Sequence, residues 1–272
     1  MNTKELMKIA LELAGFDEEP FDTTISHPGE GIKRILIGVD METPELMLAK
    51  ELDYDLVVSH HPKADDSVIH FHEVMDIQID RMVDFGVPIN KAQKALSKKQ
   101  KTVEIGMHVS NYDRVSAAAK LLDIPYMNIH LPADYIGEKF MQEYLNKEFE
   151  NKPKVKIKEI IEAIETLDVY QKSLAKPVVR CGGPEDYAGR IAVLFAGGTN
   201  GGAEVYKAYF EAGVGTIVAM HAPEEVIKEV RDQNIGNIIV AGHMPSDSIG
   251  LNAIIKAWEE QGMMVTKISG IL

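Results

Sequence analysis

The sequence contains a single cysteine, Cys181. One thiol cannot form an intrachain disulfide, which excludes a disulfide-stabilised fold and favours a reducing environment, so we expect a cytoplasmic protein. No apolar run is long enough to span a bilayer, so no membrane segment is expected. Residues 1–15 combine charged and apolar side chains at helical spacing, which indicates an amphipathic helix instead of a signal peptide.

Positive charge is also scarce. The chain has 29 basic against 42 acidic side chains, a net charge of -13, so neither nucleic acid nor an anionic membrane is an expected partner. Residues 91–101 hold a dense group of lysines, which we interpret as a solvated helix face or loop. With 45% hydrophobic residues among 272, the composition excludes a disordered chain and predicts a substantial buried core.

Short apolar runs alternate with segments of helical spacing. Residues 33–40 and 56–59 have the composition of buried strands, and Thr43-Pro44-Glu45 opens a helical segment between them. This order is typical of a βαβ unit in a parallel sheet. The same order recurs after residue 190, so we predict an α/β fold with two related αβ layers, although no sequence repeat is strong enough to establish a duplication.

Three segments far apart in the sequence carry metal-binding side chains. They are Ser59-His60-His61-Pro62, the run from His108 to Asp113, and Gly242-His243 with Asp247 four residues after the histidine. We expect each segment to follow a strand, and in an open α/β sheet binding groups gather where strands end. Imidazole and carboxylate donors suit Zn, Mn, Fe or related divalent ions. The sequence therefore predicts one shared site, with ligands enough for two ions.

The residue types suggest separate roles within this site. Pro62 fixes a turn after His60 and His61, so the two imidazoles could serve different ions. A carboxylate such as Asp113 can bridge two cations and offset their repulsion. His108 could orient that carboxylate or relay a proton, which makes it our candidate catalytic residue.

Ordinary structural roles stay open for the same residues. Asp113 and Asp247 each precede an apolar helical segment and could be N-cap residues. The histidines could be satisfied polar groups at the end of a sheet. The glycine-rich stretch 197–202 is either a tight turn or an anion contact, because it lacks the spacing of a Walker or Rossmann motif. His70 and His72 are interpreted as residues of a solvated loop.

The predicted site also suggests how the chain is divided. The pattern of elements weakens between residues 126 and 184, which we interpret as a domain change. The first domain would comprise residues 1–125 and 240–272, and the second residues 126–239. In this division the C-terminal segment returns to the first domain, because His243 must reach the cluster around His60.

At these residues the sequence resembles the NIF-three-like family, also known as GTP cyclohydrolase type-two homologues. The likeness covers most of the chain and rests on the Ser59-His60-His61-Pro62 motif, the run ending at Asp113 and the late Gly242-His243. It implies a homohexameric ring and a dinuclear centre for two divalent metal ions. The ligands that it implies are His60, His61, Asp113, His243 and Asp247.

Two departures from the family pattern are visible. The family's His-Thr-Asn-Leu-Asp run has three residues between His and Asp, whereas four residues separate His108 from Asp113. The family favours Glu at the last ligand position, where this chain has the shorter Asp247.

The predicted centre suits hydrolysis of a small molecule. Two divalent ions would polarise a carbonyl, amidine-like or phosphoryl group and make hydroxide available near neutral pH. The resemblance alone suggests a nucleotide-like substrate. The alternative is a non-enzymatic metal-binding oligomer with a regulatory or partner-recruiting role, which the same ligands would support.

Overall fold

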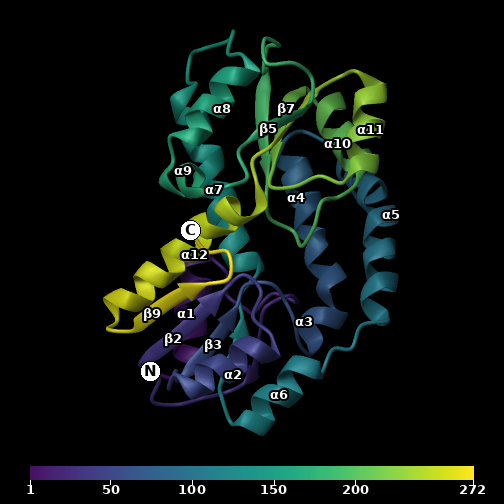
Figure 1. Cartoon of the computed structure of the whole chain (residues 1–272). Helices are drawn as coiled ribbons and strands as arrows, with labels where there is room; N and C mark the ends of the chain where they lie inside the picture. Colours follow the sequence, from purple (N-terminus) through teal and green to yellow (C-terminus); the bar gives the residue numbers. More distant parts are fainter. The chain divides into compact units, whose positions relative to one another are not determined.

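Short apolar runs form the strands of two separate sheets. The computed structural model describes residues 1–272, which divide into two units. The first unit comprises Met1–Val74, Thr102–Ile136 and Asp247–Ile271, and the second comprises Met75–Lys101, Gly137–Ser246 and Leu272. Each unit has one mostly parallel sheet accompanied by helices (Figure 1), which confirms the predicted α/β fold with two αβ layers.

The first unit is built on the strand order β1-β4-β3-β2-β9, in which only the edge strand β1 pairs antiparallel. In β2 and β3, Gly38 lies opposite Ser59, so the residues that follow these strands leave the sheet at the same edge. Every residue of β3 is buried, as expected for a parallel strand covered on both faces. The elements of this unit are α1 (Thr3–Ala14), β1 (Thr24–His27), β2 (Arg34–Gly38), α2 (Thr43–Glu51), β3 (Leu56–Ser59), α3 (Asp66–Ile69), α6 (Arg114–Leu122), β4 (Tyr126–Asn128) and β9 (Met264–Ile268).

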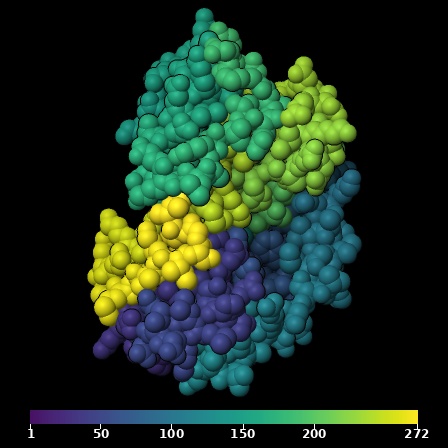
Figure 2. Space-filling view, viewed as in Figure 1, coloured from purple at the N-terminus to yellow at the C-terminus, as the bar shows by residue number.

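The C-terminal segment completes this first sheet. β9 pairs in parallel with β2, and the preceding helix α12 (His243–Glu260) buries Trp258, whose Nε1 donates a 3.0 Å hydrogen bond to the carbonyl of Leu6 in α1. In Figures 1 and 2 the yellow C-terminal segment lies against purple residues from the start of the chain. The predicted return of the C-terminal segment to the first domain is therefore confirmed.

The second unit has the strand order β5-β8-β7-β6, again with one antiparallel edge strand, β5. Its elements are α4 (Ile77–Asp84), α8 (Ile157–Glu165), α9 (Asp168–Lys172), β5 (Val178–Cys181), β6 (Arg190–Leu194), α10 (Ala203–Glu211), β7 (Val214–Ala219), α11 (Glu224–Gln233) and β8 (Asn237–Val240). The segments η1 (Phe71–Asp76), α5 (Ile89–His108), α7 (Leu131–Glu148) and α12 contain residues of both units.

The two sheets share a topology. Strands β1, β4, β3 and β2 stand in the same order as β5, β8, β7 and β6, with the antiparallel strand at the same edge. In each sheet the strand beside that edge leads into a long helix, β4 into α7 and β8 into α12. The two αβ layers, which the order of elements in the sequence suggested to be related, therefore also have the same strand connections.

The strand expected to end near His108 does not form. Residues 89–108 instead make the helix α5, because lysine, glutamine and alanine are strong helix formers and only Ala92 and Leu96 are buried. His108 is the last residue of this helix. None of the helices in the structure is apolar over a length sufficient to cross a bilayer.

The division of the chain differs from the expected one in three segments and at Leu272. Residues 126–136 belong to the first unit, because β4 pairs with β3 and β1, and residues 240–246 belong to the second. Residues 75–101 also join the second unit, where Gln78 Nε2 donates 2.7 Å hydrogen bonds to the carbonyls of Gly197 and Thr199. These bonds hold the glycine-rich stretch in place, which is the behaviour of a structural turn.

Candidate metal centre

Two imidazoles leave the sheet at the end of β3. The backbone N–H groups of His60 and His61 donate 2.9 Å hydrogen bonds to the carbonyls of Gly38 and Val39, which fixes the chain as it leaves the strand. Ser59 Oγ donates to the carbonyl of His61 at 2.8 Å and tightens the bend before Pro62. The two rings stay together, with centroids 5.2 Å apart.

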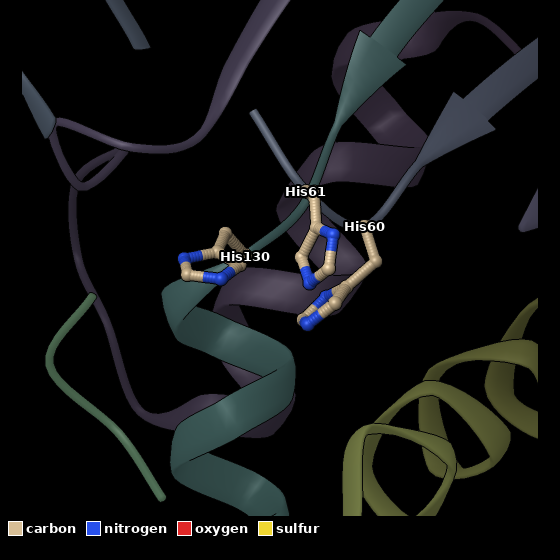
Figure 3. A group of neighbouring side chains, drawn as sticks. All are labelled: His60, His61 and His130. Carbon is tan, nitrogen blue, oxygen red and sulfur yellow. The ribbon is translucent and has the colours of Figure 1, made fainter. Parts of the chain in front are cut away.

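A third imidazole comes from the neighbouring strand. His130 follows β4 and immediately precedes α7, and its ring centroid lies 4.8 Å from that of His60 and 5.7 Å from that of His61. Figure 3 shows the three rings gathered where the two strands end. Because β3 and β4 are parallel neighbours, their carboxyl ends deliver these side chains to one place.

Two buried carboxylates face the imidazoles. Asp134 lies one helical turn after His130, with Oδ1 3.2 Å from His60 Nε2 and Oδ2 3.6 Å from His130 Nε2. Asp247 on α12 places Oδ2 3.8 Å from His60 Nε2 and 3.9 Å from His61 Nε2. Each carboxylate thus lies between two imidazoles.

The other ring nitrogen of each histidine is held from outside the cluster. The Nδ1–H of His60 donates to the carbonyl of Ile129 at 2.9 Å. Nδ1 of His61 lies 2.9 Å from Asp40 Oδ1, and Nδ1 of His130 lies 2.6 Å from Asp22 Oδ2. Such bonds set the tautomer and direct Nε2 inward, which is the usual arrangement of metal-ligating histidines.

Burial and neighbouring charges shift the pKa values at this centre. Burial, with the charges of His60 and His130, lowers the pKa of His61 to about 3, so its imidazole is neutral. Burial and the charges of Asp134 and Asp40 raise the pKa of Asp247 to about 8, although His60 opposes them. Burial also works against ionisation of Asp40, but hydrogen bonds from Lys63 and His61 outweigh it and lower the pKa of Asp40 to about 2.

The donor set fits divalent cations. The ligand atoms of His60, His61 and His130 lie within 4.8 Å of one another, as do those of His60, Asp134 and Asp247. Nε2 of His60 is buried and makes no hydrogen bond, despite its short distance to Asp134. A buried polar atom without a hydrogen bond is costly, and a cation between the donors would remove this cost. Nitrogen and oxygen donors of this kind suit Zn, Mn or Fe.

The structure brings together only some of the residues singled out in the sequence. His60, His61 and Asp247 lie in the cluster. Asp113 is exposed at the N-cap position of α6 and makes no capping hydrogen bond, and His108 is exposed at the end of α5. Neither lies among the buried donors, because the run between them joins two helices instead of following a strand.

His243 begins α12, in the part of that helix that belongs to the second unit. It precedes Asp247 by four residues, a spacing that puts both side chains on one face of the helix. Its ring centroid lies 4.8 Å from that of His221. The ligand role of His243 stays a prediction.

His130 and Asp134 were missed in the sequence, although a signal for them is present. The run His130-Leu-Pro-Ala-Asp134 has the same pattern as His243-Met-Pro-Ser-Asp247: histidine, an apolar residue, proline, a small residue and aspartate. Each run joins a strand to a long helix. The run from His130 also has the three-residue gap that His108 and Asp113 lack. A comparison of the two halves would have found it.

A scan against protein-family models and a search of curated proteins found no match. Solved structures, in contrast, match along nearly the whole chain. Reduced HcgD from Methanocaldococcus jannaschii has 15% identity and a TM-score of 0.62, over 98% of this chain and 97% of that one. A protein from Thermus thermophilus, TTHA1606, has 14% identity and a TM-score of 0.52, over 99% and 98%. These two show likeness of fold alone.

A NIF3 superfamily protein from Sphaerobacter thermophilus is much more similar. Its crystal structure matches with a TM-score of 0.96 and 34% identity, over 99% of this chain and 98% of that one. The resemblance noted in the sequence is thereby confirmed. With that identity over almost the full length of both chains, the protein belongs to the NIF3 superfamily.

Proposed function

We propose that the protein is a metal-dependent hydrolase with a dinuclear centre, acting on a nucleotide-like or related small molecule. One observation supports the proposal most strongly. Neighbouring residues hold Nδ1 of all three imidazoles, so that their Nε2 atoms point towards the two buried carboxylates. Few structural roles require so many fixed donors around one point.

Five residues of the first unit would hold the ions. Asp134 is suited to bridge, because its two oxygens face different histidines, His60 and His130. Asp247 is placed to ligate beside His60 and His61. Bound divalent cations supply Lewis acidity, which polarises a carbonyl or phosphoryl oxygen and acidifies water near neutral pH.

The surrounding residues keep the donors in position. Lys63 Nζ lies 2.7 Å from Asp40 Oδ1 and favours the ionised carboxylate that faces Nδ1 of His61. The fully buried Asp22 faces Nδ1 of His130 as Asp40 faces that of His61. It also accepts a 3.3 Å hydrogen bond from the backbone N–H of Leu131. The proposal assigns no part to His108 or Asp113.

The burial of the donors supports an alternative, a non-enzymatic metal-binding oligomer with a regulatory or partner-recruiting role. His60 and Asp247 are fully buried, and Asp134 and His130 nearly so. A closed centre is typical of a structural metal site, whereas catalysis needs an open position. The hexamer that the family resemblance implies is part of both proposals.

Two measurements separate the proposals. Elemental analysis should find about two divalent ions per chain, fewer in Asp134→Asn and an unchanged number in the matched control Asp113→Asn. A hydrolysis screen on nucleotides and phosphoesters should then show activity that chelators and Asp134→Asn remove. A fully loaded protein that hydrolyses none of them would favour the non-enzymatic role, and a metal-free wild type would reject both.

A further inference from the structure

The second unit contains a cavity that none of the candidate metal-site residues lines. Its volume is about 520 Å³, within the range of small-molecule sites. Its walls come from the end of α4, the second half of α7 with the turn after it, and the start of β6. All of these residues belong to the second unit.

The charge of this cavity is opposite to that of the chain. Three cationic side chains line it, Arg81, Lys152 and Arg190, and no acidic side chain does. The protein as a whole carries a net charge of -13. A local concentration of positive charge against that background favours an anionic ligand.

Arg190 is the cation best placed to bind such a ligand. Its Nη1 donates to the carbonyl of Phe85 at 3.0 Å, and its guanidinium carbon lies 4.5 Å from the centre of the Phe85 ring. These contacts hold the group in place, but no carboxylate pairs with it. An arginine has five N–H donors, so most of those on Arg190 are available to a ligand.

Unlike Arg190, both other cations have carboxylate partners: Lys152 Nζ lies 3.6 Å from the exposed Glu148 Oε1, and Arg81 is paired twice. Its Nε lies 2.7 Å from Glu138 Oε1, and Nη1 lies 3.4 Å from Asp84 Oδ2. Its guanidinium carbon is nevertheless 5.8 Å from the centre of the same Phe85 ring. Two guanidinium groups around one ring repel each other, and a bound anion would offset that repulsion.

The remaining wall is largely apolar. Leu145 and Val155 are buried, and the Phe149 ring lies beside them with Lys152 Nζ 5.5 Å from its centre. Gln142 ties α7 to β6: its Oε1 accepts from Val193 N at 2.9 Å, and its Nε2 donates to the carbonyl of Ile191 at 3.2 Å. A ligand would therefore find a formed surface with an aromatic side and a cationic side.

We propose that this cavity binds a small organic anion that joins a flat ring to a phosphate or carboxylate group. The anionic group pairs with Arg190 and Lys152, and the ring packs on Phe149 and its apolar neighbours. Guanidinium groups recognise both phosphates and carboxylates through paired hydrogen bonds, so the two kinds of anion share one chemistry.

Calorimetric titration of the full-length, metal-loaded protein tests this assignment. The probes are adenosine 5′-monophosphate, adenosine, benzoate and inorganic phosphate, and the variants are Arg190→Ala, Lys152→Ala and Asp134→Asn. Loss of a charge-assisted hydrogen bond should weaken monophosphate or benzoate binding about tenfold in each cavity variant. Asp134→Asn should leave that binding unchanged, which separates the cavity from the metal centre.

The outcomes decide the proposal directly. Tighter binding of the monophosphate than of benzoate or inorganic phosphate would identify a ring-bearing phosphate. Tighter binding of benzoate than of either phosphate probe would identify a ring-bearing carboxylate. Adenosine binding as tightly as its monophosphate would overturn the anionic assignment. The assignment would also be overturned if monophosphate and benzoate bound equally well to the wild type, Lys152→Ala and Arg190→Ala. Lys152 is exposed, so its replacement leaves the fold intact.

Discussion

Nε2 of His60 lies 3.2 Å from Oδ1 of Asp134, yet it makes no hydrogen bond. The side chains of both residues are almost completely buried. Such a pair is costly unless a third group joins it, and the other imidazoles and Asp247 surround the same point.

Asp22 should matter for metal binding without touching the metal. Its carboxylate fixes Nδ1 of His130, and loss of an outer partner of this kind typically weakens metal affinity about 10–100-fold. We expect Asp22→Asn to show such a loss in a competitive chelator titration. The exposed Asp17→Asn is the matched control, and equal affinities of the two variants would exclude an orienting role.

Metal binding should release a proton from Asp247. Its pKa of about 8 means that the metal-free protein holds this proton at neutral pH, whereas His61, with a pKa of about 3, is already neutral. Proton release, measured by calorimetry in buffers of different ionisation enthalpy, should fall as the pH rises through about 8. Asp247→Asn should lack this component. Release that does not change over this pH range would contradict the raised pKa.

Gly250 allows α12 to approach the start of α7. A Cβ at this position would overlap the carbonyl oxygen of Ala133, next to Asp134. We expect Gly250→Ala to cost about 1–3 kcal/mol in urea unfolding, as overpacking does, and to reduce metal content. Gly106→Ala in α5 meets nothing within 4 Å and should be neutral or stabilising. If the two variants were equally stable, the helix contact would not control the site.

Glu138 should be a strong stability determinant of the second unit. It is fully buried, pairs with Arg81 at 2.7 Å and accepts 2.9 Å hydrogen bonds from the backbone N–H groups of Phe195 and Ala196. Removal of one partner from a buried pair costs about 3–5 kcal/mol, which we expect for Glu138→Gln in denaturant unfolding. Glu143→Gln, exposed on the same helix, should change stability by less than about 0.5 kcal/mol. A cost for Glu138→Gln as small as that control would show that the pair is dispensable.

Much of the fold could be predicted from the sequence, because short apolar runs such as residues 56–59 become fully buried parallel strands. His60 and His61 were found for the same reason, since they directly follow such a run. The strand that we expected to end near His108 does not exist, because the polar residues before it form the helix α5. His130 was missed because β4 has only three residues and gives almost no periodic signal. The packing of α12 against α1, which places Asp247, depends on contacts between residues more than 200 positions apart, and local pattern cannot show it.

Anomalous X-ray diffraction from crystals grown with Zn²⁺ or Mn²⁺ tests the central claim most directly. We predict two anomalous peaks per chain within coordination distance of His60, His61, His130, Asp134 and Asp247, at about 2.0–2.3 Å. Peaks at His108 or Asp113, or no peak among these five donors, would contradict the proposed centre.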